Sequence, residues 1–309
     1  MIAFIFPGQG SQTVGMGKAL AEAFPEARKT FEEADAAFGG PLSRLCFEGP
    51  EDQLTLTENT QPAILAVSIA ACRVLGSRGI TPALVAGHSL GEYSANVAAG
   101  TFGFADAVGI VRRRGRYMQE AVPVGQGAMA AILGLDAALV QQACDEAAQG
   151  EVVSPANINS REQVVIAGTA GAVQRASERA KALGAKRAIP LTVSAPFHCA
   201  LMKPAEDRLA PELRALAVQA PRVPVVANVD AEPKRDPAAA IEALVRQVSS
   251  PVLWEAVVHR LASEGVTTYV EVGPGRVLSG LVKKIHKDAR VYTFGAPEDL
   301  APLESAVHA

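Results

Sequence analysis

Residues 84–96 have the sequence LVAGHSLGEYSAN, and this stretch decides the fold class. Its first four residues are short and apolar, as in a buried strand, whereas the Ala-rich stretch after Ser89 is typical of a helix. Ser89 lies between Gly87 and Gly91 in a G-x-S-x-G motif. A strand, this motif and a helix in that order predict an α/β fold in which a sharp turn exposes a nucleophilic serine. The alternative is a plain strand–helix turn with a capping serine.

Short apolar runs alternate with helical patterns on both sides of this motif. The run IAFIF (2–6) predicts a buried strand that ends in the loop PGQGSQTVGMG, whose glycines let a backbone approach a ligand closely. Helices are expected over 18–37 and 61–75, and strands over 223–229 and 268–275. Such alternation predicts an α/β fold with a mostly parallel sheet.

The middle of the chain has a different order of elements. We expect a strand over 128–133, a helix over 136–148, strands over 152–157 and 163–168, a helix over 170–183 and an edge strand over 188–193 that contains Pro190. This β-α-β-β-α-β order is that of a ferredoxin-like unit. The sequence therefore predicts a ferredoxin-like small domain (124–194) inserted into an α/β-hydrolase-like large domain (1–123 and 195–309).

Composition excludes several classes of function. The chain has 309 residues and a net charge of −3, so nothing global suggests binding to nucleic acid. Its four cysteines are scattered without a C-x-x-C pair, which argues against a zinc ribbon and a thioredoxin-like site and indicates reduced thiols. We find no signal peptide and no uncharged apolar stretch of about 18 residues. We therefore expect a cytoplasmic protein with no bound metal and no membrane partner.

A nucleophilic serine needs a base, and the chain has five histidines. His198 lies in a proline-containing loop just after a predicted strand, where α/β folds keep catalytic residues. It is the best candidate. The other histidines are expected elsewhere: His88 beneath the serine turn, His259 partly buried in a helix, and His286 and His308 in solvent. Cys199, next to His198, is a much weaker candidate nucleophile than Ser89.

One arginine of the predicted helix GFADAVGIVRRRGRYMQEAV (103–122) lies on its apolar face. At 100° per residue, Arg114 falls on the same side as Val111 and Met118, whereas its three arginine neighbours in this helix point towards solvent. A buried guanidinium needs a partner because burying it unpaired is costly. The partner is either a carboxylate of the core, in a structural salt bridge, or the carboxylate of an anionic substrate.

Seven stretches along nearly the whole chain occur in the order found in one enzyme family. They are FPGQGSQ (6–12), GHSLGEYSA (87–95), RRGRYMQEAVP (113–123), ANINSREQVVIAG (156–168), APFHCALM (195–202), VRQVSSPVLW (245–254) and EVGPGRVL (271–278). By these motifs the chain resembles the acyltransferase family that includes the malonyl-CoA:acyl carrier protein transacylases of bacterial fatty-acid synthesis. More broadly, it is similar to the acyltransferase domains of polyketide synthases.

The resemblance implies a role for each matching residue. Ser89 would be acylated, and His198 would be its base, oriented by a backbone carbonyl near Gln247. Gln9 and Leu90 would supply the backbone N–H groups of the oxyanion hole. The substrate-binding residues would be Arg114, which would grip the free malonyl carboxylate, and Phe197, which would favour malonyl over methylmalonyl groups.

The resemblance also implies the reaction and its partners. Malonyl-CoA would acylate the serine, CoA would leave, and the phosphopantetheine thiol of an acidic acyl carrier protein would accept the malonyl group, with no cofactor of the enzyme itself. Basic candidates for docking the carrier are Lys186, Arg187, Arg276, Lys283 and Lys284, each of which could equally be scattered surface charge.

Three other functions stay open at this point. A polyketide or polyunsaturated-lipid acyltransferase would carry the same motifs. A serine hydrolase would need an acid to hold the histidine, for which Asp106, Asp136 and Asp145 lie in the right part of the sequence. A non-catalytic acyl-binding relative would be expected to lack Ser89 or His198.

Overall fold

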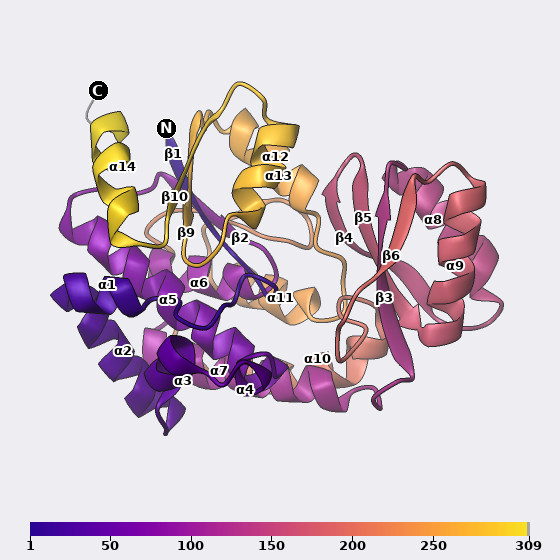
Figure 1. The fold of residues 1–309 in the computed structure, drawn as a ribbon, viewed down its shortest axis with the longest axis horizontal. Helices are drawn as coiled ribbons and strands as arrows, with labels where there is room; N and C mark the ends of the chain where they lie inside the picture. The colour runs from indigo at the N-terminus through magenta and orange to yellow at the C-terminus, as the bar shows by residue number, and fades with distance from the viewer. Residues whose placement is uncertain (308–309) are drawn as a thin grey trace.

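Two β-sheets organise the chain in the computed structural model, which describes residues 1–307 (Figure 1). The larger sheet and most helices lie on the left of Figure 1, and a four-stranded sheet with two helices lies on the right. The prediction of a mixed α/β fold with a parallel sheet is confirmed.

The larger sheet has six strands. Their order is β10 (Arg290–Phe294), β9 (Thr268–Val272), β1 (Ile2–Phe6), β2 (Leu84–Gly87), β7 (Val225–Val226) and β8 (Pro233–Lys234). All neighbouring pairs are parallel except β7 and β8. The carboxyl ends of β1 and β2 therefore meet at one edge of the sheet, where the glycine-rich loop and the serine turn follow.

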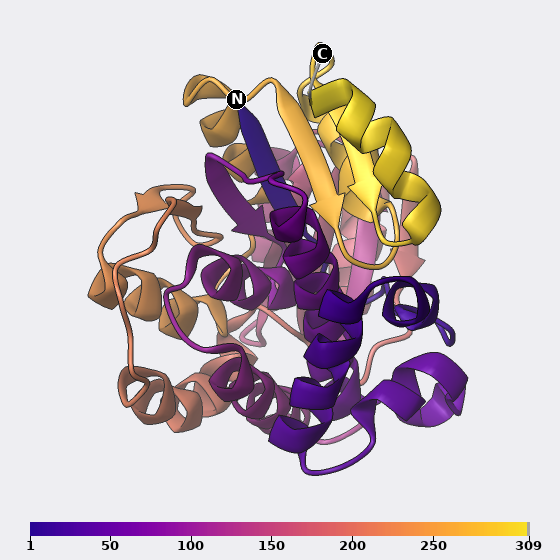
Figure 2. The same cartoon turned by 90° about the vertical axis from the view of Figure 1, so that its left-hand side faces the viewer.

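Helices cover both faces of this sheet (Figure 2). Phe4 and Phe6 of β1 belong to the core shared with the helices of the first 120 residues, whereas Ala3 and Ile5 face the two helices between residues 254 and 285, as the alternation of a strand requires. The first group comprises α1 (Lys18–Ala23), α2 (Pro25–Phe38), α3 (Leu42–Glu48), α4 (Glu51–Leu54), α5 (Thr57–Ser77), α6 (Leu90–Ala99) and α7 (Phe104–Glu120). The opposite face packs against α12 (Trp254–Ser263) and α13 (Val277–Ile285).

Five further helices lie between residues 200 and 307. They are η1 (Ala200–Met202), α10 (Lys203–Arg214), α11 (Pro237–Gln247), η2 (Pro297–Asp299) and α14 (Leu300–Val307). Helix α5 is long and apolar enough to cross a membrane by those criteria alone, but 78% of its apolar window is buried in the fold. This burial is what a core helix shows.

The second sheet contains the strands predicted from the middle of the sequence. Its order is β4 (Val153–Ser160), β5 (Gln163–Thr169), β3 (Gly127–Leu133) and β6 (Arg187–Pro190), all antiparallel, with α8 (Ala137–Ala148) and α9 (Ala170–Ala182) packed against it. Strand β4 also joins the second sheet to the segment that precedes α12, where Ile158 N donates to Val252 O at 2.9 Å and Val252 N donates to Ala156 O at 2.9 Å.

Three predicted elements differ from the structure. The helix expected over 18–37 is two helices, since Phe24 is extended (φ −127°, ψ 124°) before Pro25, and a residue before proline avoids the helical conformation. The edge strand expected over 188–193 lies at the sheet edge but ends at Pro190. The strand expected over 223–229 is limited to Val225–Val226.

Candidate active site

The turn at Ser89 is strained, and two glycines make it possible. Ser89 has a φ of 52° and a ψ of −107°, and it immediately precedes α6. A Cβ on Gly87 would lie 2.0 Å from the Gly91 backbone, and one on Gly91 would lie 2.0 Å from Phe6 O. Any larger side chain at either position would push the helix away from the sheet. Strain of this kind is characteristic of functional turns, and here it presents the hydroxyl above the sheet edge.

His198 lies against the Ser89 hydroxyl. The distance between Ser89 Oγ and His198 Nε2 is 2.7 Å, although 109 residues separate the two in sequence. His198 Nδ1 lies 2.9 Å from Gln247 O, and a carbonyl only accepts, so Nδ1 carries the proton and Nε2 presents its lone pair to the hydroxyl. Burial, together with the nearby Arg114 charge, lowers the pKa of His198 to about 3. The imidazole is therefore neutral at physiological pH and available as a base.

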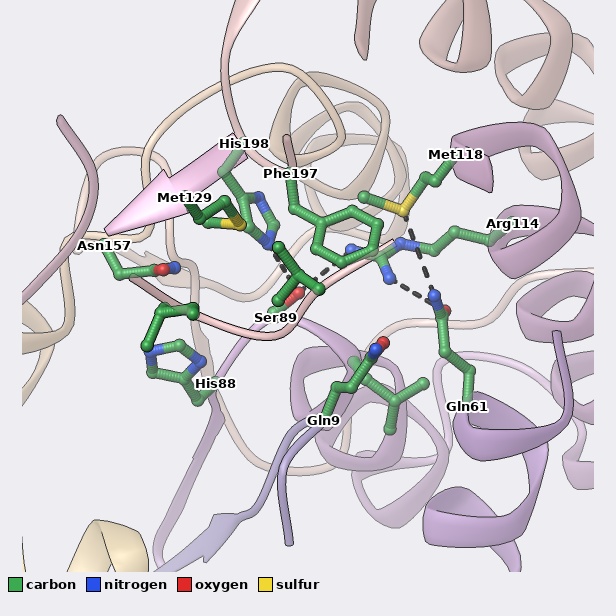
Figure 3. A pocket seen from close by; sticks show the side chains of 13 residues that line it. Gln9, Gln61, His88, Ser89, Arg114, Met118, Met129, Asn157, Phe197 and His198 are labelled. Carbon is green, nitrogen blue, oxygen red and sulfur yellow. Dashed lines mark hydrogen bonds between the residues drawn. The ribbon is translucent and has the colours of Figure 1, made fainter. Parts of the chain in front are cut away.

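The side chain of Arg114 is buried, with 2% exposure, as the helical periodicity predicted. Its Nη2 donates to Ser89 Oγ at 3.1 Å and to Gln247 Oε1 at 2.9 Å, and its Nη1 donates to Gln61 Oε1 at 2.8 Å. No carboxylate among residues 1–307 forms a direct ion pair with it. The structural salt bridge considered from sequence is thus not formed. Figure 3 shows Arg114 directed towards Ser89.

Gln247 connects these groups. Besides its carbonyl bond to His198, its side-chain Nε2 donates to Ser89 O at 2.8 Å and to Glu92 Oε2 at 2.7 Å. Asn228 supports the same turn, since its Oδ1 accepts from Ser89 N at 2.8 Å and its Nδ2 donates to Gly87 O at 2.7 Å. One side of the serine turn is therefore held by side chains from two later segments of the chain.

A cavity of about 140 Å³ opens in front of Ser89, between the two sheets (Figure 3). Its walls come from both parts of the chain: Gln9, Gln61, His88, Ser89, Leu90, Arg114, Met118, Met129, Asn157, Leu191, Val193, Phe197 and His198. Gln9 and Leu90 both line it. The backbone N–H of Leu90 opens α6, where the positive end of the helix dipole favours a developing negative charge.

Sequence reasoning missed three of the residues that hold this site. Gln61 and Asn228 bind Arg114 and the serine turn, respectively, and Glu92 binds Gln247. Gln61 and Asn228 lie far from Ser89 in sequence and carry no motif of their own. Glu92 gave little signal as well, because acidic residues are common in the first turn of a helix, where they complement the helix dipole.

The other described histidines do not contact Ser89 Oγ. His88 is half-buried and its Nε2 is 2.8 Å from Asn159 Oδ1 of the second sheet, while burial lowers its pKa. Two predictions were wrong: His259 is exposed rather than partly buried, and His286 is half-buried against Tyr269 Oη at 3.1 Å rather than solvated. His308 lies outside the described residues.

The thiol next to His198 is a poor candidate nucleophile. Cys199 is buried, its Sγ donates to Pro196 O at 3.1 Å, and burial raises its pKa to about 11. The thiolate is the reactive form of cysteine, so a thiol with this pKa is a poor nucleophile at neutral pH.

The acids considered for a hydrolase triad do not contact His198. Asp136 caps α8 by accepting from Leu139 N at 2.9 Å, Asp145 accepts from Gln141 at 2.7 Å, and Asp106 lies in the first turn of α7. Within residues 1–307, no three His, Cys, Asp or Glu side chains are grouped so that they could hold a metal ion.

The basic residues considered for carrier docking are all exposed. Arg187 begins β6 and Lys186 precedes it, whereas Arg276, Lys283 and Lys284 lie in or beside α13. None of the five lines the cavity at Ser89. The five residues therefore lie in two separate groups on the surface.

Comparison with known proteins shows what this chain is similar to. The family model described as "Acyl transferase domain" matches residues 3–300. The malonyl CoA-acyl carrier protein transacylase of Escherichia coli K12 is 54% identical over 300 residues, which cover 97% of each chain. The structure of an acyl carrier protein S-malonyltransferase from Vibrio cholerae matches with a TM-score of 0.96 at 49% identity, covering 98% of this chain and 99% of that one. A malonyl-transacylase solved in complex with a type II polyketide acyl carrier protein matches with a TM-score of 0.95 at 50% identity, covering 97% of both chains.

Proposed function

The chain belongs to the acyl transferase family, and from this premise we propose that it transfers the malonyl group of malonyl-CoA to the phosphopantetheine thiol of an acyl carrier protein. The observation that carries the proposal is the position of Ser89 Oγ, which lies within hydrogen-bond distance of both the neutral His198 and the buried guanidinium of Arg114. The names of its relatives at about half identity support the same reaction.

The first half-reaction loads the enzyme. The malonyl carboxylate binds Arg114, Ser89 Oγ attacks the thioester carbonyl, and His198 Nε2 accepts the hydroxyl proton. The backbone N–H groups of Leu90 and Gln9 would stabilise the oxyanion. The C–S bond then breaks, and the protonated imidazole returns its proton to the CoA thiolate, which leaves a malonyl ester on Ser89.

The second half-reaction reverses these roles with a different thiol. His198 Nε2 accepts the proton of the phosphopantetheine thiol, whose sulfur attacks the malonyl ester, and Ser89 leaves as an alkoxide that recovers the proton. The partners are thus malonyl-CoA and an acidic carrier protein, in the cytoplasm, for fatty-acid synthesis. The enzyme needs no cofactor of its own for this exchange.

The fold supports this reaction with a cleft between two parts. We propose that the second sheet is the predicted ferredoxin-like domain (124–194), inserted in an α/β-hydrolase-like domain, and that the cleft limits access of water to the malonyl ester. The strand order β4-β5-β3-β6 and the parallel main sheet support this assignment. So does the cavity, whose walls include Met129 and Asn157 of the second sheet.

A second candidate function is the same transfer to a polyketide carrier protein. The observation in its favour is the similarity to the malonyl-transacylase of the polyketide complex. Comparing malonyl transfer to purified fatty-acid and polyketide carrier proteins would separate the two. A hydrolase is disfavoured because a backbone carbonyl rather than a carboxylate orients His198.

Removing the guanidinium tests the substrate class. We expect R114A to lose about 2–5 kcal/mol of transition-state stabilisation in malonyl transfer, the range for breaking a buried charge pair. Acetyl transfer should lose far less because the acetyl group carries no carboxylate. The measurement is kcat/KM for both donors, with R116A as the control, since Arg116 is exposed on the same helix. Equal losses for the two donors would show that Arg114 is only structural.

Widening the pocket at Phe197 tests the acyl specificity. Phe197 is buried and lines the cavity, so its ring would oppose the extra methyl group of methylmalonyl-CoA. We expect F197S to raise the ratio of methylmalonyl to malonyl transfer by about tenfold, the usual scale for one methyl group in an apolar pocket. Competition between the two donors, followed by intact mass, measures this ratio. An unchanged ratio would assign the specificity to another wall of the cavity.

A further inference from the structure

Glu92 is a buried carboxylate directly behind the nucleophile. It lies three residues after Ser89 in the first turn of α6, and it is 1% exposed. Its Oε2 accepts from Asn228 N at 3.1 Å and from Gln247 Nε2 at 2.7 Å. It does not line the cavity, and the reaction described above does not use it.

A single amide separates this carboxylate from the buried guanidinium. The side chain of Gln247 donates from Nε2 to Glu92 and to Ser89 O, and it accepts with Oε1 from Arg114 Nη2 at 2.9 Å. All groups around Nε2 are acceptors and the group facing Oε1 is a donor, so the amide has only one favourable orientation. Glu92 thereby helps to determine where Gln247 holds Arg114.

The arrangement balances charge without blocking the arginine. The three hydrogen-bond partners of Arg114 are neutral, namely Gln61, Gln247 and Ser89, and a buried guanidinium needs a compensating charge nearby. Glu92 supplies that charge from the far side of the amide. A direct contact would occupy the guanidinium N–H groups that a substrate carboxylate needs.

We propose that Glu92 is a positioning residue that serves as the resident counter-charge of Arg114, acting through Gln247, and so sets how strongly Arg114 attracts the carboxylate of the acyl donor. This inference rests on the proposed function, because it concerns binding of malonyl-CoA at the same site. It adds that the ionisation state of Glu92 controls this binding.

The surroundings of Glu92 determine in which pH range this control acts. Burial raises the pKa of Glu92 to about 7, although the hydrogen bonds from Gln247 and Asn228 oppose this rise. The charge of Asp230 adds to the rise, and the Arg114 charge opposes it more weakly than the hydrogen bonds do. Tyr93, the next residue on α6, has its pKa raised by burial to about 12. His198 lies across Gln247, with its pKa lowered to about 3. Of these neighbours, Tyr93 and His198 keep one charge state around pH 7.

The sign of the effect follows from electrostatics. Above pH 7 Glu92 is ionised, compensates Arg114 and repels a second carboxylate. Below pH 7 Glu92 is protonated, so the full attraction of Arg114 is available to malonyl-CoA. The KM for malonyl-CoA should therefore rise as the pH rises through the pKa of Glu92, whereas acetyl-CoA, which has no free carboxylate, should not show this rise.

The test compares the wild-type protein with E92Q from about pH 5.5 to 9. The substituted glutamine can still accept both hydrogen bonds through its side-chain oxygen, but it carries no charge. For acylation of Ser89 we expect the wild-type KM for malonyl-CoA to increase about fivefold or more across this range, the lower end of typical coupling between two sites. The E92Q variant should bind malonyl-CoA equally tightly at both ends of the range. The CoA moiety and its ionisable groups are the same in both donors. The pH profile of KM for acetyl-CoA therefore corrects the malonyl-CoA profile for their titration.

The matched control is E271Q. Glu271 is also buried, accepts from Leu278 N at 3.1 Å and Ser279 N at 2.7 Å, and has its pKa raised by burial, but unlike Glu92 it forms no hydrogen bond with Gln247. E271Q should keep the wild-type pH dependence. A malonyl-CoA KM in E92Q that still rises with pH would overturn the inference, as would an equal rise for acetyl-CoA in the wild type. Absence of any malonyl label on the wild-type protein would instead overturn the proposed function itself.

Discussion

The S89A variant is expected to form no covalent adduct with malonyl-CoA. Removing Oγ removes the atom that is hydrogen-bonded both to the His198 base and to the Arg114 guanidinium, and loss of the nucleophile in a serine enzyme costs about 10⁶-fold in kcat. The strained turn itself should persist, because Gly87 and Gly91 determine its close packing and alanine is no larger than serine. The measurement is the intact mass of the protein after brief exposure to malonyl-CoA.

A second serine of the same helix provides the control. Ser94 of α6 is completely buried, and its hydroxyl has no hydrogen-bond partner within the described chain. S94A should therefore acquire the malonyl mass as the wild type does. A malonyl adduct on S89A, located by peptide mapping, would assign the nucleophile to another residue.

Loss of the base is expected to have the next largest effect. We expect H198A to slow both half-reactions by about 10²–10⁴-fold, the usual contribution of general acid–base catalysis. The same Nε2, 2.7 Å from Ser89 Oγ, would accept the serine proton in loading and the thiol proton in transfer. Rapid-quench measurements of malonyl-enzyme formation and of its discharge to the carrier protein separate the two steps.

The exposed His259 gives the control for this prediction, since H259A removes an imidazole that is not part of the cavity lining.

Because burial lowers the pKa of His198 to about 3, its neutral form should persist throughout about pH 5–9. The rate of acetyl-enzyme formation should therefore not fall as the pH drops through about 6.5, where an ordinary histidine becomes protonated. A normal loading rate in H198A would make another group the base.

Much of the fold could be predicted because it depends on local patterns. The buried strand at 2–6 and the strand–turn–helix around Ser89 appear where the apolar runs and the glycines indicated them. The errors have local causes too. Phe24 breaks the predicted helix over 18–37 because Pro25 follows it, and the strand expected over 223–229 is short because only Val225–Val226 pair with the sheet.

Two features of the site follow from short stretches of sequence. The G-x-S-x-G motif indicated the sharp turn that presents Ser89 as the candidate nucleophile, because only residues without a side chain fit on both sides of this turn. The 3.6-residue period indicated that Arg114 faces inward, because the side a helical residue faces depends only on its neighbours along the chain. Both are short-range properties, and both describe one residue at a time.

The packing of distant segments sets what these residues touch, and of these contacts the family resemblance had implied only those of His198 with Ser89, of His198 with a carbonyl near Gln247, and of Arg114 with substrate. Gln247 lies 158 residues from Ser89 in sequence but is hydrogen-bonded to it. The backbone carbonyl of Gln247, rather than a carboxylate, accepts the hydrogen bond of His198 Nδ1. The side chain of Gln247 lies between Glu92 and Arg114. No periodicity links positions so far apart, since their distance depends on how the sheet, α6, α7 and α11 pack. Hydrogen-bond orientation and the compensation of a buried charge are properties of that packing, so the site's electrostatics could be read only from the folded chain.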